Sequence, residues 1–249
     1  MDVEVYIKEL KKYNSINRDE NPFHKTLNSL GKIQLQAVLL QYSYFPKNIV
    51  AILVSATYNL SFNGCSELSS ELIRNINEEL GVYSEETALA IPEPHYTILR
   101  KALLEGLNIE IGCLQPSVST ETFINKLFDF VNQTNINIAL GAIFALESSA
   151  IPELEIVLDI VKKRFSMENR ETPKYLLDFF LFHINEIEIG HRDRFFELCS
   201  MYLSTKKQKI EFELGFKNVL KEMDKWWFNM YEDIVHSKTN LAKEDSIHF

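Results

Sequence analysis

Four side chains that bind metals in many proteins lie close together in the otherwise apolar segment 179–191. They are His183, Glu186, Glu188 and His191. Imidazole and carboxylate ligands suit iron, manganese and zinc. A helix directs such groups to one side only where they recur every three or four positions. The segment therefore predicts part of a metal site, and the helical spacing decides which of the four residues contribute.

The spacing selects Glu188 and His191. At about 100° per residue, these two residues lie on one buried stripe of a helix, whereas His183 lies about 140° from Glu188. One extra residue, accommodated as a π-bulge, would bring His183 to the same side, and such bulges are frequent at functional sites. Glu186 follows His183 by three residues, but its stripe continues into charged residues and so faces solvent. The alternative for Glu188 is a surface ion pair with Arg192, four residues later.

One helix cannot complete such a site, and two glutamates on other segments are candidates for the rest. Glu79 lies on the apolar face of a helix predicted for residues 66–80, where leucine would be expected. Its neighbour Glu78 follows Arg74 by four residues and is expected to pair with it in solvent. Glu147 is the first acid of an apolar helix that begins near residue 135, so a metal, a cation, hydrogen-bond donors or a proton must offset its burial. The alternative is a glutamate at a helix end near Pro152 that reaches water.

His95 is the third candidate, on the apolar face of a helix predicted for residues 93–104. Alone it would more often be a core or capping residue than a ligand. Helical scaffolds build dinuclear sites by pointing acids and histidines from several helices into the core. The candidates together supply three carboxylates and three imidazoles, a suitable set of ligands for two iron ions, or for manganese as the alternative. The complete set is Glu79, His95, Glu147, His183, Glu188 and His191.

The composition of the chain indicates an all-α protein. Of its 249 residues, 46% are hydrophobic, which is enough for a sizeable core, and only eight are glycine and seven proline. Apolar residues recur mostly at intervals of three and four, which favours helices over sheet. We expect one domain over residues 1–249, with a short lead helix at 3–13 and a solvated tail at 237–249.

The positions of three prolines and the C-terminal aromatic residues set further expectations. Pro46 should end the helix that begins near residue 33, because the residue before a proline disfavours helix. Pro92 and Pro94 predict a loop or short helix over residues 84–94. Trp227 belongs to an apolar stripe of the last helix, and both Trp226 and Trp227 are expected in the core rather than stacked on a cofactor.

Charge and cysteine usage limit the partners. The net charge of −9, from 35 acidic and 26 basic residues, argues against a nucleic-acid partner, because phosphate binding needs clustered Lys and Arg. Cys65, Cys113 and Cys199 are isolated, which predicts buried thiols in a reducing compartment rather than disulfides or a cysteine zinc site. The N-terminus lacks a basic region before an apolar run, and no stretch reaches the ~18 apolar residues of a membrane span. We expect a cytoplasmic protein without nucleic-acid or membrane partners.

The order of the candidate residues resembles that of the heme-oxygenase-like diiron oxidases, in particular the CADD-like proteins. The segment 77–81 (Asn-Glu-Glu-Leu-Gly) is similar to the family's first glutamate helix, and His95 to the histidine that follows it. The segment Ala145-Leu146-Glu147, with Pro152, is similar to the central glutamate helix. Residues 183–191 are similar to the paired histidines around an acid. The chain departs from the pattern in two places: the gap from Glu79 to His95 is longer, and the last motif has one extra residue and Glu for Asp.

The resemblance implies a bundle of seven or eight helices, often a homodimer, that binds two irons and uses dioxygen to oxidise or cleave a small metabolite. It implies that the six residues hold the metals and that Glu79, Glu147 and His191 are essential to catalysis. The same fold also serves metal-free enzymes similar to PqqC and TenA, which leaves acid–base catalysis by Glu and His as an alternative. A third alternative is an interaction protein whose amphipathic helices bind a partner.

Overall fold

The fold is described from a computed structural model of the chain, which covers residue 9, residues 18–82 and residues 93–236. Three expectations fall outside these residues. They are the lead helix at 3–13, most of the loop predicted for 84–94, and the tail at 237–249.

Helices account for almost all of the described residues, none of which is in a strand. The α-helices are α2 (Pro22–Thr26), α3 (Lys32–Phe62), α4 (Ser66–Glu79), α5 (His95–Leu107), α6 (Val118–Val131), α7 (Ile136–Ser166), α8 (Lys174–Phe182), α9 (Glu188–Tyr202) and α10 (Lys206–His236). A π-helical turn, His183–Ile187, joins α8 to α9, and 3-10 turns occupy Arg18–Glu20 and Leu27–Ser29. With α8, the π turn and α9 counted as one rod, the described residues form eight helices. The prediction of an all-α bundle is confirmed.

Two prolines lie inside long helices. Pro46 is within α3 and Pro152 within α7, so the prediction that Pro46 ends a helix is wrong. Proline removes one backbone hydrogen bond and normally kinks or breaks a helix. Here the helix is buried on both sides of Pro46, with Leu39 before it and Ile52 after it in the core. Tertiary packing of this kind contributes more to a helix than local propensity does, which explains why α3 continues.

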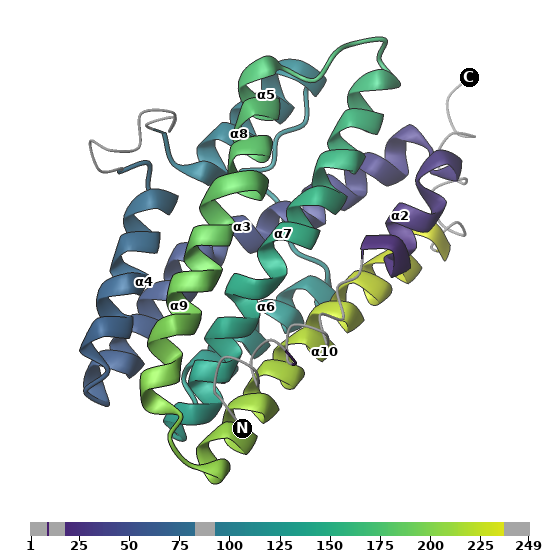
Figure 1. Cartoon of the computed structure of the whole chain (residues 1–249). Coiled ribbons are helices and arrows are strands. Elements are labelled where there is room, and N and C mark those ends of the chain that lie inside the picture. Colours follow the sequence, from purple (N-terminus) through teal and green to yellow (C-terminus); the bar gives the residue numbers. More distant parts are fainter. Residues whose placement is uncertain (1–8, 10–17, 83–92, 237–249) are drawn as a thin grey trace.

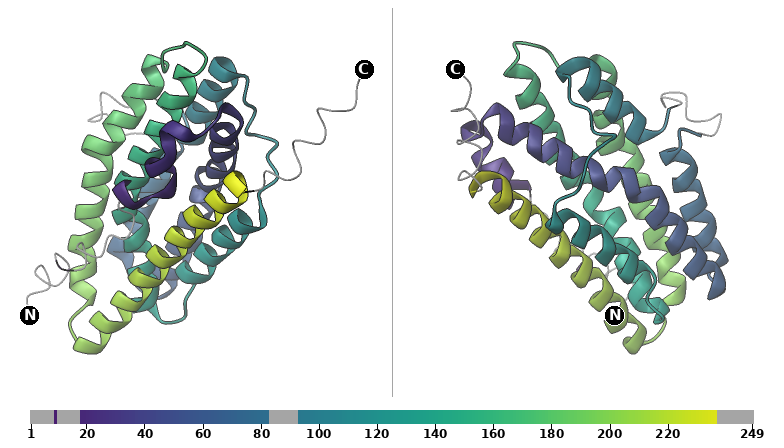
Figure 2. Two further views of the ribbon diagram at one scale, coloured as in Figure 1. Left: turned by 90° about the vertical axis from the view of Figure 1, so that its right-hand side faces the viewer. Right: turned by 180° about the vertical axis from the view of Figure 1, so that it is seen from behind.

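The helix that carries Glu147 is fixed by a close crossing of α7 and α10. A Cβ atom on Gly141 would lie 1.9 Å from the carbonyl oxygen of Phe212, and one on Gly215 would lie 2.0 Å from that of Ile138. The two backbones therefore touch at a point where only glycine fits. In Figure 1 and in the rear view of Figure 2, α4 and α10 lie on opposite sides of the bundle, with α7 between them.

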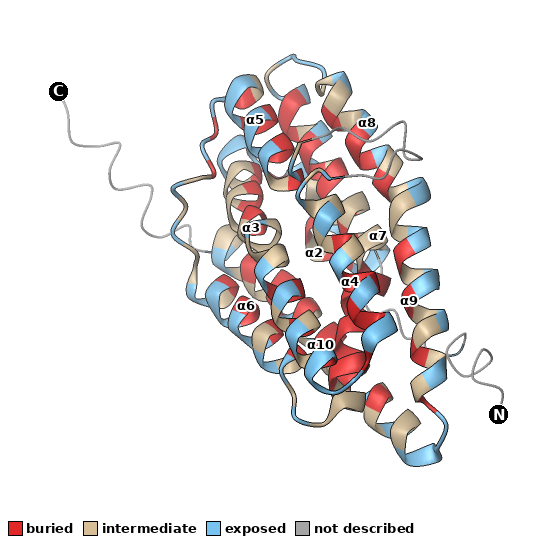
Figure 3. Cartoon of the chain, turned by 90° about the vertical axis from the view of Figure 1, so that its left-hand side faces the viewer, coloured by how far each residue is buried: buried red, intermediate tan, exposed pale blue. Residues whose placement is uncertain are grey.

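Every long helix carries buried residues, which are red in Figure 3. Trp226 and Trp227 are both in the core, as predicted, and the ring of Trp226 stacks on Phe123 with centroids 4.3 Å apart. Cys65 and Cys199 are buried, but Cys113 is exposed, so the expectation of three buried thiols is wrong for that residue. It lies in the connection between α5 and α6.

By length and composition, α3 could cross a membrane, the one such helix in the described part of the chain. A core helix of a globular protein passes the same test. Leu35, Ile52 and Leu60 of α3 are fully buried, and the helix packs against α4, α6 and α7. This packing accounts for part of the apolar composition of α3, of whose most apolar window 33% is buried.

Candidate metal centre

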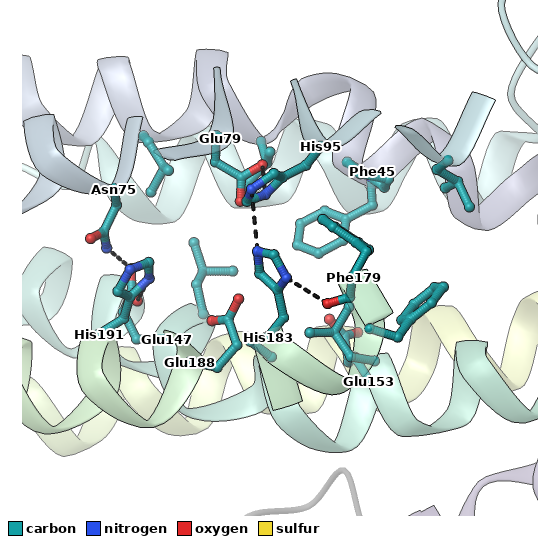
Figure 4. A pocket seen from close by; sticks show the side chains of 18 of the residues that line it. Phe45, Asn75, Glu79, His95, Glu147, Glu153, Phe179, His183, Glu188 and His191 are labelled. Carbon is teal, nitrogen blue, oxygen red and sulfur yellow. Dashed lines mark hydrogen bonds and ion pairs between the residues drawn. The ribbon is translucent and has the colours of Figure 1, made fainter. Parts of the chain in front are cut away.

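One cavity brings together all six residues that the sequence singles out. They come from five parts of the fold: Glu79 from α4, His95 from α5, Glu147 from α7, His183 from the π turn, and Glu188 and His191 from α9. The cavity has a volume of about 120 Å³. Figure 4 shows Glu147 and His191 at one end of it and His95 above His183 near its middle.

The π turn explains how His183 and Glu188 line the same cavity. The turn begins at His183 and ends at Ile187, so it places one extra residue between the two side chains. The predicted bulge is therefore confirmed. Glu188 lines the cavity, whereas Glu186 is exposed and borders a separate surface depression. Arg192 pairs with Asp193, not with Glu188, among the interactions of the described residues.

Glu147, Glu188 and His191 form a cluster of three potential ligands. One potential ligand atom from each lies within 4.8 Å of the other two, a spacing at which they could hold one metal ion. Nδ1 of His191 is 3.9 Å from Oε2 of Glu147. Glu147 is buried and α7 continues past it for five turns, so the alternative of a glutamate at a helix end in water is wrong.

His183 and His95 form a second group with Glu79. Nδ1 of His183 donates to the carbonyl oxygen of Phe179 at 2.8 Å, which leaves Nε2 of His183 with a lone pair toward the cavity. That Nε2 lies 3.2 Å from Nε2 of His95, while Nδ1 of His95 is 3.1 Å from Oε2 of Glu79. Two imidazole rings and a carboxylate thus form a second group in the cavity, beside the cluster of Glu147, Glu188 and His191.

Burial disfavours the ionised carboxyl groups in this cavity. It raises the pKa of Glu147 to about 7, and it raises the pKa of Glu188 above its usual range. Burial, together with nearby His95, lowers the pKa of His183 to about 4. No Lys or Arg is among the described residues that line the cavity. The charge of nearby His191 offsets only part of this burial, and a bound cation would supply further positive charge.

Glu78 has a role that sequence reasoning missed. It pairs with Arg74 as predicted, but its side chain is only 12% exposed, so the pair is not in solvent. Nε2 of His191 donates to Oε2 of Glu78 at 2.6 Å. Burial alone would lower the pKa of His191, but this bond and the neighbouring carboxylates raise it to about 9. The bond also leaves Nδ1 of His191 facing Glu147.

Asn75 is the other residue that was missed. It lies one helical turn before Glu79 on α4, and that spacing of four is the signal that could have revealed it. Nδ2 of Asn75 donates to Oε1 of Glu147 at 3.1 Å, within the buried interior. Its Oδ1 is buried and has no hydrogen-bond partner among the described residues. Asn75 fixes the orientation of the Glu147 carboxylate.

A family model and one named relative match the chain. A family model described as a "Domain of Unknown Function with solved-structure structure (DUF3865)" matches residues 7–233. The 4-chloro-allylglycine synthase of Streptantibioticus cattleyicolor is 24% identical over 165 residues, which cover 65% of this chain. The matched segment is 58% of the length of that synthase.

Solved structures match over nearly the whole chain. A crystal structure of a CADD-like protein of unknown function from Nostoc punctiforme PCC 73102 is 27% identical, with a TM-score of 0.84 over 94% of this chain and 99% of that one. A second crystal structure of that protein is 26% identical, with a TM-score of 0.83 over 97% of this chain and 99% of that one. A TenA homologue from Pyrococcus furiosus, 19% identical over 91% of this chain and 100% of that one, has a TM-score of 0.60 and shows the fold alone. The chain belongs to the DUF3865 family and has the CADD-like, heme-oxygenase-like fold.

Proposed function

We propose that this protein is a non-heme diiron enzyme that uses dioxygen to oxidise or cleave a small metabolite. The observation that carries the proposal is the convergence of three carboxylates and three imidazoles, from five parts of the fold, on one cavity without Lys or Arg among its described lining residues. Helical bundles that hold two irons use ligands of these types in this kind of arrangement. The distant relative that is named as a synthase supports enzymatic activity.

The donor set fits two ions. Glu147, Glu188 and His191 would hold one, since their ligand atoms lie within 4.8 Å of each other. Glu79, His95 and His183 would hold the other, with an ion taking the place of the contact between the two imidazole nitrogens, which now face each other at 3.2 Å. Carboxylate and imidazole ligands suit iron, and manganese is the alternative. When bound as ferrous iron, the pair supplies the electrons that reduce dioxygen.

The surrounding residues keep this set in place and exclude water. Glu78 holds the ring of His191, and Asn75 holds the carboxylate of Glu147. Apolar side chains line much of the remaining cavity wall, among them Phe45 and Leu99. A dry wall of this kind strengthens the electrostatic interactions inside the site and protects reactive species from water.

A metal-free enzyme is the second candidate. The pKa of Glu147, raised by burial to about 7, suits a general acid or base at neutral pH, and His191 lies beside it. The TenA-like fold supports this candidate at the level of fold only.

Dioxygen consumption separates the two candidates. The protein is loaded with ferrous iron without air, freed of unbound metal, and transferred to an oxygen electrode. We expect iron-dependent dioxygen uptake that Glu147→Ala abolishes and Glu155→Gln, a control on the same helix outside the described cavity lining, retains. Iron-independent turnover of a substrate, or equal uptake by wild type and Glu147→Ala, would contradict the diiron proposal.

A further inference from the structure

Glu153 is a second carboxyl group in the same cavity, away from the proposed metal ligands. It follows Glu147 by six residues on α7, which is about 9 Å along the helix axis. Its side chain lines the cavity and is 2% exposed. In Figure 4 it lies with Phe179 and Phe45 at the end of the pocket opposite to Glu147 and His191.

The contacts of Glu153 leave much of its carboxyl group unsatisfied. Nε1 of Trp227 donates to Oε1 at 3.1 Å, the one hydrogen bond to this carboxyl among the described residues. A carboxylate has about four acceptor positions. The nearby Asp224 adds negative charge, and no Lys or Arg lines the cavity within the described ranges. Burial accordingly raises the pKa of Glu153 to about 8.

A buried acid without a cationic partner is costly unless something else offsets it. Phe45 and Phe179 lie at the same end of the cavity as Glu153 (Figure 4), and Tyr42 and Phe180 add further aromatic rings to the cavity lining. Aromatic faces attract cations and repel anions. The chemistry of this end of the cavity therefore favours a positively charged nitrogen over a carboxylate or an uncharged hydroxyl group.

We propose that Glu153 recognises the substrate by accepting hydrogen bonds from an ammonium group, while an apolar part of the substrate extends toward the cluster at Glu147. The proposal rests on the proposed function, in which that cluster holds a metal ion. It assigns the substrate to the short aliphatic amines. The cavity volume of about 120 Å³ suits a molecule of about six non-hydrogen atoms, since a cavity of about 150 Å³ accommodates benzene.

Proton balance is maintained when such a substrate binds. A neutral amine that reaches a protonated Glu153 takes the proton from the carboxyl group, and an ammonium–carboxylate pair forms. The N–H bond that forms replaces the O–H bond that breaks, and no proton leaves the site. Charge-assisted hydrogen bonds of this type are about twice as strong as those between neutral groups.

Pentylamine is a suitable probe, with pentanol and pentanoate as ligands of matched length. Binding is measured by titration calorimetry on iron-loaded and metal-free protein, for wild type and for four variants: Glu153→Gln, Glu153→Leu, Glu155→Gln and Glu147→Gln. Gln keeps an acceptor for Trp227, and Leu removes the polar group, so at least one replacement is expected to fold. Glu155 lies on the same helix outside the described cavity lining and serves as the matched control.

We expect wild type and Glu155→Gln to bind pentylamine in preference to pentanol and pentanoate. We expect both Glu153 variants to bind it about tenfold more weakly or worse, with unchanged iron content. Equal binding by wild type and the Glu153 variants, or no preference of wild type for the amine, would overturn the proposal. Loss of amine binding in Glu147→Gln alone would also overturn it, because the cation would then occupy the cluster. If the protein binds no iron, the proposed function fails, while the metal-free titrations still test Glu153.

Discussion

Nε2 of His191 donates to Oε2 of Glu78 at 2.6 Å, and Nδ1 of the same ring lies 3.9 Å from Oε2 of Glu147. The carboxylate of Glu78 can only accept a hydrogen bond at this contact, so Nε2 of His191 carries a proton. Glu78, which lies on another helix, therefore determines that Nδ1 is the nitrogen left for a metal ion. Arg74 binds Glu78 from the other side and so keeps its carboxylate ionised. Burial alone would raise the pKa of Glu78, but the bonds to His191 and Arg74 lower it. The chain therefore prepares Nδ1 of His191 as a ligand in advance.

Replacing Glu78 tests this preparation. We expect Glu78→Ala to weaken binding of Fe(II) or Mn(II) by about 10- to 100-fold, the usual effect of removing a carboxylate that orients a metal-bound histidine. Glu78→Gln retains an acceptor and should recover part of the affinity. Anaerobic titration of the two variants and wild type measures the change. Unaltered affinity in Glu78→Ala would show that His191 does not depend on this bond.

The π turn provides a second prediction. Deleting the exposed Asn185 would convert the turn into regular α-helix and rotate His183 by about 100° relative to Glu188. We expect the deletion variant to remain helical by circular dichroism and to bind one iron per chain rather than two. His183→Ala is the matched control and should show the same loss. A deletion variant that still holds two irons would indicate that the bulge does not position His183.

The crossing of α7 and α10 predicts the effect of adding a single methyl group. Gly141→Ala would place a Cβ atom 1.9 Å from the carbonyl oxygen of Phe212, so the helices must separate. We expect a loss of about 1–3 kcal/mol in the free energy of unfolding, as for other overpacked cores. Gly190→Ala is the control, because its Cβ atom would meet nothing within 4 Å and alanine favours helix. Chemical denaturation of both variants measures the difference, and equal stabilities would contradict the described crossing.

Glu153 predicts how the stability of the metal-free protein depends on pH. Its pKa rises from 4.5 to about 8 in the folded chain because the carboxyl group is buried. The folded state therefore holds a proton that the unfolded state loses above pH 4.5. The contribution of Glu153 to stability is fully present below pH 4.5 and is lost as the pH rises through 8.

We expect the melting temperature of the metal-free wild type to decrease as the pH rises from 5 to 8. The melting temperature of Glu153→Gln should decrease less over the same range. The difference in free energy of unfolding at pH 8 should be at least about 1 kcal/mol, since one pKa unit corresponds to about 1.4 kcal/mol. Glu155→Gln controls for a general charge effect. Parallel pH profiles for wild type and Glu153→Gln would contradict the burial of this acid.

Much of the site could be predicted from sequence because its residues break the apolar pattern of their own helices. Glu79 and Glu147 occupy positions where leucine is expected, and the one-residue excess between His183 and Glu188 indicated a bulge. The choice of Glu188 over Glu186 followed from the faces of a single helix, and Glu188 is the one that lines the cavity.

The remaining residues depend on how helices pack against each other. The contact of Glu78 with His191 requires the rotation of α4 against α9, which no pattern within one helix gives. Glu153 was missed because its burial against Trp227 depends on how α7 packs against α10, which the pattern within α7 does not give. The single domain, the homodimer and the cytoplasmic location stay predictions.

Iron content after anaerobic loading tests the central claim most directly. Protein is incubated with excess ferrous iron without air, freed of unbound metal by gel filtration, and analysed for iron per chain. We expect two irons per chain in wild type and Glu155→Gln, and a loss of at least one in Glu147→Ala. No bound iron in wild type, or undiminished iron in Glu147→Ala, would contradict the assignment of this cavity as a diiron centre.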